Sequence, residues 1–218
     1  MAERLTDVRR RISSAGGVGV EVLAVTKTWG VDAAFAAHRA GCRAIGENYA
    51  AETVAKLAGV QRPFAVHFIG RLQSNKVRQL AGLVDVYESL DRTSLIDELA
   101  RRAPGAEVLV QVNTTGELGK GGCPVAAVVP LVGAARDAGL VVRGLMTVGP
   151  TEGGPEAARP GFRLVRSLVS ELGLAVCSMG MTADLEVAVE EGTTRVRVGS
   201  ALFGPRVDQG ASPSGTAG

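Results

Sequence analysis

Residues 174–204 have the sequence LAVCSMGMTADLEVAVEEGTTRVRVGSALFG, which contains a strand, a helix and a second strand in succession. The segments 174–178 and 195–198 are short and rich in apolar and β-branched residues, as buried strands are. The segment between them has apolar residues at helical spacing over 182–191. Two strands separated by one helix predict a parallel pair joined by a right-handed crossover, so this stretch favours an α/β fold.

The same pattern of a short strand, a loop and a helix recurs from residue 20 onward. The predicted strands are at 20–26, 43–46, 65–69, 84–88, 107–113, 141–146, 174–178 and 195–198. The predicted helices are at 31–40, 49–58, 73–81, 93–102, 125–138, 156–172 and 182–191. Eight such units in about 200 residues predict a closed (βα)8 TIM barrel. An open doubly wound sheet is the alternative, but TKTWGVDAAF follows the first strand where that fold would have a GxGxxG loop.

The two ends of the chain differ from this repeat. Leu5, Val8 and Ile12 share one face at spacings of three and four residues, which predicts an extra helix before the barrel. Residues 207–218 are rich in Gly, Ser, Pro and Ala and have no periodicity. We therefore expect one α/β barrel domain over residues 1–206 and a disordered tail over 207–218.

Composition excludes several classes of function. The 24 Lys and Arg residues nearly balance the 22 Asp and Glu residues, and no basic stripe stands out, which argues against nucleic-acid binding. Three widely spaced cysteines fit neither a disulfide framework nor a metal clip, and two histidines without a zinc-binding pattern predict no metal site. No apolar run approaches the ~20 residues of a membrane span, and the charged first residues do not resemble a signal peptide. We expect a cytoplasmic protein.

Reactive and polar residues gather where the predicted strands end. In a barrel the C-terminal strand ends share one rim, so side chains there converge on a common pocket. The loops after the seventh and eighth strands have the composition of a phosphate site. Ser178 and Thr182 offer hydroxyls, Gly180 and Gly199 let backbone amides approach closely, and Ser200 begins a short helix with free N–H groups. We expect a phosphate-bearing ligand at this edge.

Lys27 ends the first predicted strand and belongs to the same rim. A lysine in this position can extend its amine into solvent. Alternatively, partial burial and a neighbouring arginine lower the pKa of the amine, and its neutral form then attacks an aldehyde. Facing a phosphate pocket, such an amine is typical of either a pyridoxal phosphate (PLP) site or a Schiff-base aldolase.

Several segments together resemble one known family. They are AVTKT (24–28), IGENY (45–49), HFIGRLQSNK (67–76), RGLMTV (143–148) and the stretch from Ser178 to Gly204. This chain resembles the pyridoxal phosphate homeostasis protein family, single-domain (βα)8 proteins related to the barrel of bacterial alanine racemases. The resemblance implies that Lys27 forms a Schiff base with PLP and that Arg197 faces the pyridine nitrogen. It also implies phosphate binding by Ser178, Gly199 and Ser200, with Asn48 lining the pocket.

The resemblance implies a carrier or regulator of PLP, involved in vitamin B6 and amino-acid homeostasis, with no established turnover. An arginine that donates to the ring nitrogen leaves the ring a weaker electron sink, which favours binding over catalysis. A weak racemase that uses Lys27 as its single acid/base is the alternative, because Tyr49 and Tyr87 are poorly placed as a second base. A cofactor-free Schiff-base aldolase is a further alternative. Apo PLP-dependent enzymes are expected partners, and the protein is expected to be a monomer or a weak dimer.

Overall fold

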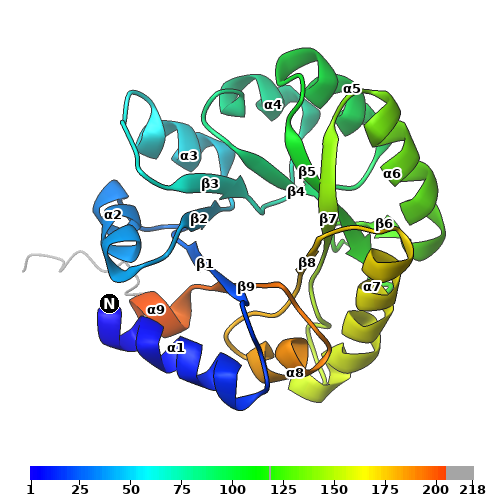
Figure 1. The fold of residues 1–218 in the computed structure, drawn as a ribbon. Helices are drawn as coiled ribbons and strands as arrows, with labels where there is room; N and C mark the ends of the chain where they lie inside the picture. The colour runs from blue at the N-terminus through cyan, green and yellow to red at the C-terminus, as the bar shows by residue number, and fades with distance from the viewer. Residues whose placement is uncertain (118, 205–218) are drawn as a thin grey trace, which may run out of the picture.

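The structure is a computed structural model that describes residues 1–117 and 119–204. Within these residues, eight parallel strands close into a barrel surrounded by helices (Figure 1). The barrel strands are β1 (Glu21–Val25), β2 (Ala44–Glu47), β3 (Ala65–Phe68), β4 (Val86–Leu90), β5 (Glu107–Asn113), β7 (Val141–Thr147), β8 (Val176–Ser178) and β9 (Arg195–Val198). Neighbouring strands follow the chain order, β9 pairs with β1, and the pairing of β4 with β5 completes the circle. The predicted TIM barrel is confirmed.

A helix follows each barrel strand on the outside of the barrel. These helices are α2 (Val31–Ala40), α3 (Ala50–Leu57), α4 (Ser74–Leu80), α5 (Thr93–Arg102), α6 (Val128–Asp137), α7 (Arg159–Glu171), α8 (Leu185–Glu190) and α9 (Ser200–Phe203). Short 3-10 turns, η1 (Val125–Ala127) and η2 (Pro155–Ala158), precede α6 and α7. The expected boundary at residue 206 and the expected tail 207–218 lie outside the described residues.

The extra N-terminal helix is α1 (Ala2–Ser14), and it packs beside α8 and α9 (Figure 1). Its buried face consists of Leu5, Val8 and Ile12, the residues expected from the spacing. They join one apolar cluster with residues of β1, β9 and α8. Burying these side chains removes apolar surface from water, which holds α1 against the outside of the barrel.

Two details differ from the predicted elements. A two-residue strand, β6 (Cys123–Pro124), pairs with the end of β5, beyond the last residue at which β5 pairs with β4. A strand of two residues is too short to give the alternating sequence pattern from which strands are predicted. The helix predicted over 182–191 begins at Leu185, because the Asp184 carboxylate accepts a hydrogen bond from the Met181 N–H at 2.6 Å and holds the preceding residues in a turn.

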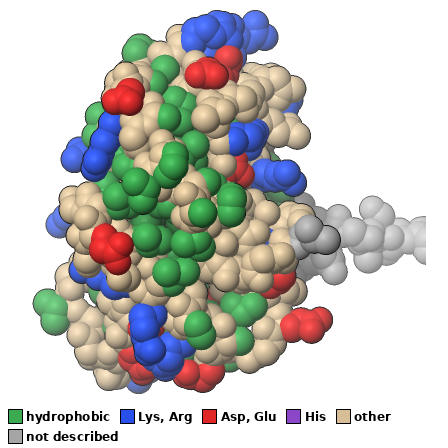
Figure 2. Space-filling model, turned by 90° about the vertical axis from the view of Figure 1, so that its right-hand side faces the viewer, with side chains coloured by type: hydrophobic (Ala, Val, Ile, Leu, Met, Phe, Trp, Pro, Cys, Tyr) green, Lys and Arg blue, Asp and Glu red, His purple; other side chains and the backbone are tan. Residues whose placement is uncertain are grey.

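One side of the barrel carries a group of hydrophobic side chains, seen in Figure 2 on the side where α6 and α7 lie. Val129 on α6 and Leu164 on α7 are exposed, and the partly buried Val125 and Leu168 pack against the main core. The exposed hydrophobic side chains therefore lie next to the apolar core between the helices and the strands. No helix among the described residues combines the length and the apolar composition needed to cross a membrane.

Candidate functional site

A cavity of about 370 Å³ opens where the barrel strands end. Its volume lies within the range of small-molecule sites, roughly 300–1,000 Å³. It is lined by Val25, Lys27, Trp29, Asn48, Ile69, Met146, Val148, Met181, Thr182, Ala183, Arg197, Gly199, Ser200 and Gly204. Five of the seven predicted site residues line it, namely Lys27, Asn48, Arg197, Gly199 and Ser200. The structure therefore brings together residues far apart in the sequence.

The alternation of β1 brings Lys27 to this cavity. Side chains of a strand point alternately to its two faces, so Val25 and Lys27 line the cavity, while the Thr26 hydroxyl donates to Glu47, a residue that Lys56 of α3 also binds. Thr28 then has a φ of 67°, in the left-handed region, and turns the chain away from the strand direction. Lys27 is half-buried at this turn. Lys27 thus belongs to the cavity wall rather than to the outer surface of the barrel.

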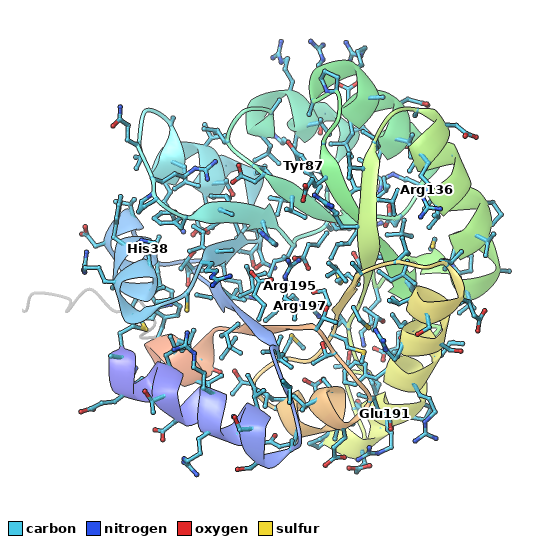
Figure 3. All side chains as sticks on the ribbon, viewed as in Figure 1. His38, Tyr87, Arg136, Glu191, Arg195 and Arg197 are labelled. Atoms are coloured by element: carbon cyan, nitrogen blue, oxygen red, sulfur yellow. The ribbon has the colours of Figure 1, made fainter. Side chains whose placement is uncertain are left out.

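Arg197 is held rigidly beside the cavity. Arg195 and Arg197 both extend from β9 toward the middle of the barrel (Figure 3). The Nη1 of Arg197 donates to the carbonyl of Ser178 at 2.8 Å and to its hydroxyl at 2.9 Å, and Nη2 donates to the Thr147 carbonyl at 2.7 Å. Burial lowers the pKa of this guanidinium. With both terminal nitrogens engaged, the side chain has little rotational freedom.

Ser178 and Gly180 are not among the residues that line the cavity. The Ser178 hydroxyl donates to Glu88 Oε2 at 2.7 Å, below Arg197. Gly180 has a φ of 90°, and a Cβ atom there would lie 2.4 Å from the Cβ of Ala188, so a turn and a close approach to α8 both require glycine. Their expected contact with a phosphate stays a prediction.

The hydroxyls that do face the cavity after strands β8 and β9 belong to Thr182 and Ser200. Their oxygens lie 3.2 Å apart. Gly199 precedes Ser200 at the start of α9, and the carbonyl of Gly199 accepts the N–H groups of Leu202 and Phe203. This pair of hydroxyls can donate to one anionic group, as the sequence pattern of the two loops indicates.

Trp29 borders one side of the cavity and packs against Phe203 of α9. The ring centroids of Trp29 and Phe203 lie 5.6 Å apart. Trp29 lines the cavity directly after the left-handed turn at Thr28. Trp29 is the single tryptophan of the chain, so its fluorescence reports on this part of the cavity.

Beneath the cavity, the barrel interior contains a buried charged cluster around Glu88. Its Oε1 lies 2.7 Å from Nδ1 of His67 and 2.9 Å from Nη1 of Arg195. Burial opposes ionisation of Glu88, but the hydrogen bond with His67 and the charges of Arg195 and Arg197 lower its pKa to about 2. This cluster was not expected from the sequence, although a glutamate inside the apolar run VYESL is the signal that could have indicated it.

A second buried network lies between the barrel and α3. Lys56 Nζ, whose side chain is 4% exposed, donates to Glu47 Oε1 at 2.7 Å, to Glu52 Oε1 at 3.0 Å and to the Thr26 carbonyl at 2.8 Å. The Thr26 hydroxyl also donates to Glu47. Burial raises the pKa of Glu47, and the hydrogen bonds from Lys56 and Thr26 oppose the rise. Sequence patterns did not indicate this network, because its members come from three separate elements.

Asn48 in the cavity wall carries a polar atom without a partner in the described part of the chain. The Oδ1 of Asn48 is buried and has no hydrogen-bond partner among the described residues. A buried polar atom without a partner is unfavourable by about 1–3 kcal/mol, and a bound ligand with a suitable polar group removes this cost. An amine, an amide and a guanidinium thus face one small cavity beside two hydroxyls. This set suits a small, phosphorylated, aromatic aldehyde.

Known proteins match this chain over almost its whole length. The alanine racemase N-terminal domain family matches residues 1–207. The pyridoxal phosphate homeostasis proteins of Pseudomonas aeruginosa and Aquifex aeolicus are 38% and 39% identical to it, covering 98% and 94% of this chain and 99% and 97% of theirs. The structure of Synechococcus elongatus PipY with PLP bound has a TM-score of 0.82 and 31% identity, and the match covers 93% of this chain and 99% of that one. The chain therefore belongs to the pyridoxal phosphate homeostasis protein family.

Proposed function

We propose that this protein binds PLP in the cavity, holds it covalently through the amine of Lys27, and stores or delivers it within the cell. The observation that carries the proposal is the single cavity lined by Lys27, Asn48 and Arg197. The PLP bound to the similar PipY supports the same ligand here. The relatives' shared description as homeostasis proteins supports a carrier role.

Each part of the cofactor has a partner of suitable chemistry in the wall. Bound PLP supplies an aldehyde, and Nζ of Lys27 can form a bond to the aldehyde carbon while the oxygen leaves as water. Arg197 would donate to the ring nitrogen, because a guanidinium has donors and no acceptor. Ser200 and Thr182 would donate to the phosphate, with Gly199 allowing its close approach. Asn48 would bond a polar substituent of the ring.

The residues of the cavity wall suit a protein that holds the cofactor rather than an enzyme that converts an amino acid. Among the residues that the structure describes, Lys27 and Arg197 are the titratable side chains in the cavity wall, and we assign both to the cofactor. Tyr49 is 54% exposed. Tyr87 packs in the core outside the strands, toward α4 and α5 (Figure 3), where burial raises its pKa to about 12. Neither tyrosine lines the cavity as a second acid/base, which supports a carrier over a racemase.

Delivery to apo PLP-dependent enzymes in the cytoplasm is part of this proposal. The three cysteines of the chain, Cys42, Cys123 and Cys177, are free and buried. Free cysteines suit a reducing compartment, in which such enzymes would receive the cofactor. We propose a monomer or weak dimer as the delivering species, to be tested by sedimentation with and without PLP.

Borohydride reduction followed by peptide mass spectrometry tests the function. The wild-type protein mixed with PLP should gain the reduced cofactor mass on Lys27, and Lys27→Ala should gain none. Lys76→Ala, which removes a lysine of α4 outside the cavity wall, is the matched control and should behave as wild type. Labelling of another lysine, or no labelling, would contradict the proposal.

Two further outcomes identify the alternatives. Racemisation of alanine or serine that disappears in Lys27→Ala would favour a weak racemase over a carrier. Failure to bind PLP, together with cleavage of a sugar phosphate, would favour the cofactor-free aldolase.

A further inference from the structure

We propose that the pair Glu52 and Lys56 of α3 positions Lys27 by holding the backbone on both sides of it. The pair lies at i and i+4 of the helix and therefore on one helical face. This inference rests on the proposed function, because it assigns to α3 the task of directing the amine that attaches the cofactor. Glu52 and Lys56 are positioning residues in this role.

On the N-terminal side of Lys27, the contact is made by Lys56. Its Nζ donates to the carbonyl oxygen of Thr26 at 2.8 Å, and this carbonyl belongs to the peptide bond that joins Thr26 to Lys27. The same nitrogen is bound to Glu47 at 2.7 Å, which comes from the end of β2. The end of β1 is thereby tied to both β2 and α3 at the residue before Lys27.

On the C-terminal side, the contact is made by Glu52. Its Oε1 accepts a hydrogen bond from the N–H of Thr28 at 2.6 Å and another from Lys56 Nζ at 3.0 Å. Thr28 is the one residue other than glycine with a positive φ among the described residues. A left-handed conformation is unfavourable for a β-branched residue, so it persists where surrounding contacts hold it. The charge-assisted bond to Glu52 is such a contact.

The pair does not contact the cavity directly. Glu52 and Lys56 do not line the cavity; they line a hollow on the other side of Trp29, between the loop after β1 and α3. Thr26 and Glu47, which complete the network, are buried between the strands and α3 and are also outside the cavity wall. A change in this network should therefore alter where the amine points, with little effect on the surfaces that bind the ring and phosphate.

The test examines Glu52→Ala in two backgrounds, the wild-type chain and Lys27→Ala. In the chain with Lys27, we measure the rate at which added PLP becomes trappable by borohydride, and in Lys27→Ala we measure non-covalent PLP affinity. Loss of the charge-assisted bond to Thr28 should slow covalent attachment about tenfold. The same substitution in the Lys27→Ala background should change PLP affinity less than about twofold, because the cavity wall is intact.

Two further variants complete the comparison. Glu52→Gln retains a side-chain carbonyl that can accept the Thr28 N–H, so it should recover most of the wild-type attachment rate. Glu98→Ala is the matched control, because Glu98 also pairs with cations at i+3 and i+4 on its helix, α5, but has no contact with the Lys27 turn. Its attachment rate should equal that of wild type.

The outcomes separate this inference from the proposed function. An unchanged attachment rate in Glu52→Ala would overturn the positioning role. A loss of non-covalent PLP affinity in the Lys27→Ala background as large as the loss of attachment rate would also overturn it, since it would indicate general damage to the cavity. If wild-type protein itself gains no cofactor on Lys27, the proposed function fails before any Glu52 variant is compared.

Discussion

Replacing Glu88 by glutamine should remove a pH-dependent part of the folded state's stability. Glu88 is fully buried in the barrel interior and receives hydrogen bonds from His67, Arg195 and Ser178. Glutamine has nearly the same shape as glutamate but no charge. The positive charges of the buried Arg195 and Arg197 would therefore lose the negative charge that balances them. The substitution therefore measures the interaction of the charge rather than the loss of packing.

The magnitude follows from the pKa of this carboxyl group. It falls from the usual 4.5 to about 2 in the folded protein. Each pKa unit corresponds to ~1.4 kcal/mol, so ionised Glu88 stabilises the folded state by about 3 kcal/mol. Because the folded pKa is depressed, this stabilisation is complete above about pH 4.5 and is lost as the pH falls toward 2.

Urea unfolding, followed by circular dichroism between about pH 7 and pH 3, measures the effect. At neutral pH the unfolding free energy of Glu88→Gln should be lower than that of wild type by about 3 kcal/mol. The difference should shrink steadily below about pH 4.5, because wild-type Glu88 then becomes protonated in the unfolded state. Glu98→Gln, which removes a carboxylate paired with the exposed Arg101 and Arg102 of α5, should differ little from wild type at any pH. A difference for Glu88→Gln that is constant across this range would refute the reasoning.

Three other substitutions test the site and its supports. Gly180→Ala should lower the unfolding free energy by more than about 2 kcal/mol in a urea titration, because the new methyl group meets Ala188 and the φ is 90°. Ser178→Ala should cost about 1–3 kcal/mol of stability by the same measurement, since both Glu88 and Arg197 lose a buried partner; a neutral result would mean that this hydroxyl does not support Arg197. Ser200→Ala should weaken PLP binding by about 1–3 kcal/mol in a fluorescence titration through Trp29. If Ser200→Ala binds PLP with the same affinity as wild type, the phosphate does not contact Ser200.

The barrel could be predicted because each of its parts has a local signal. Short apolar runs recur eight times and alternate with seven helical patterns and the loops between them, and parallel strands joined by helices have few ways to close. The same local signals placed Lys27 at the end of β1 and Gly199 and Ser200 at the end of β9. Since all parallel strands of a closed barrel end on one rim, the sequence alone brought these residues to one site.

Contacts between side chains of different strands depend on the stagger of the barrel, and only the tertiary structure decided them. Ser178 has the position expected for a cavity residue, yet its hydroxyl turns to Glu88, a residue ninety positions earlier in the chain. The alternation of a strand predicts which face a side chain occupies but not its height relative to neighbouring strands. For the same reason, no sequence pattern indicated that Glu52 and Lys56 would meet the backbone on either side of Lys27.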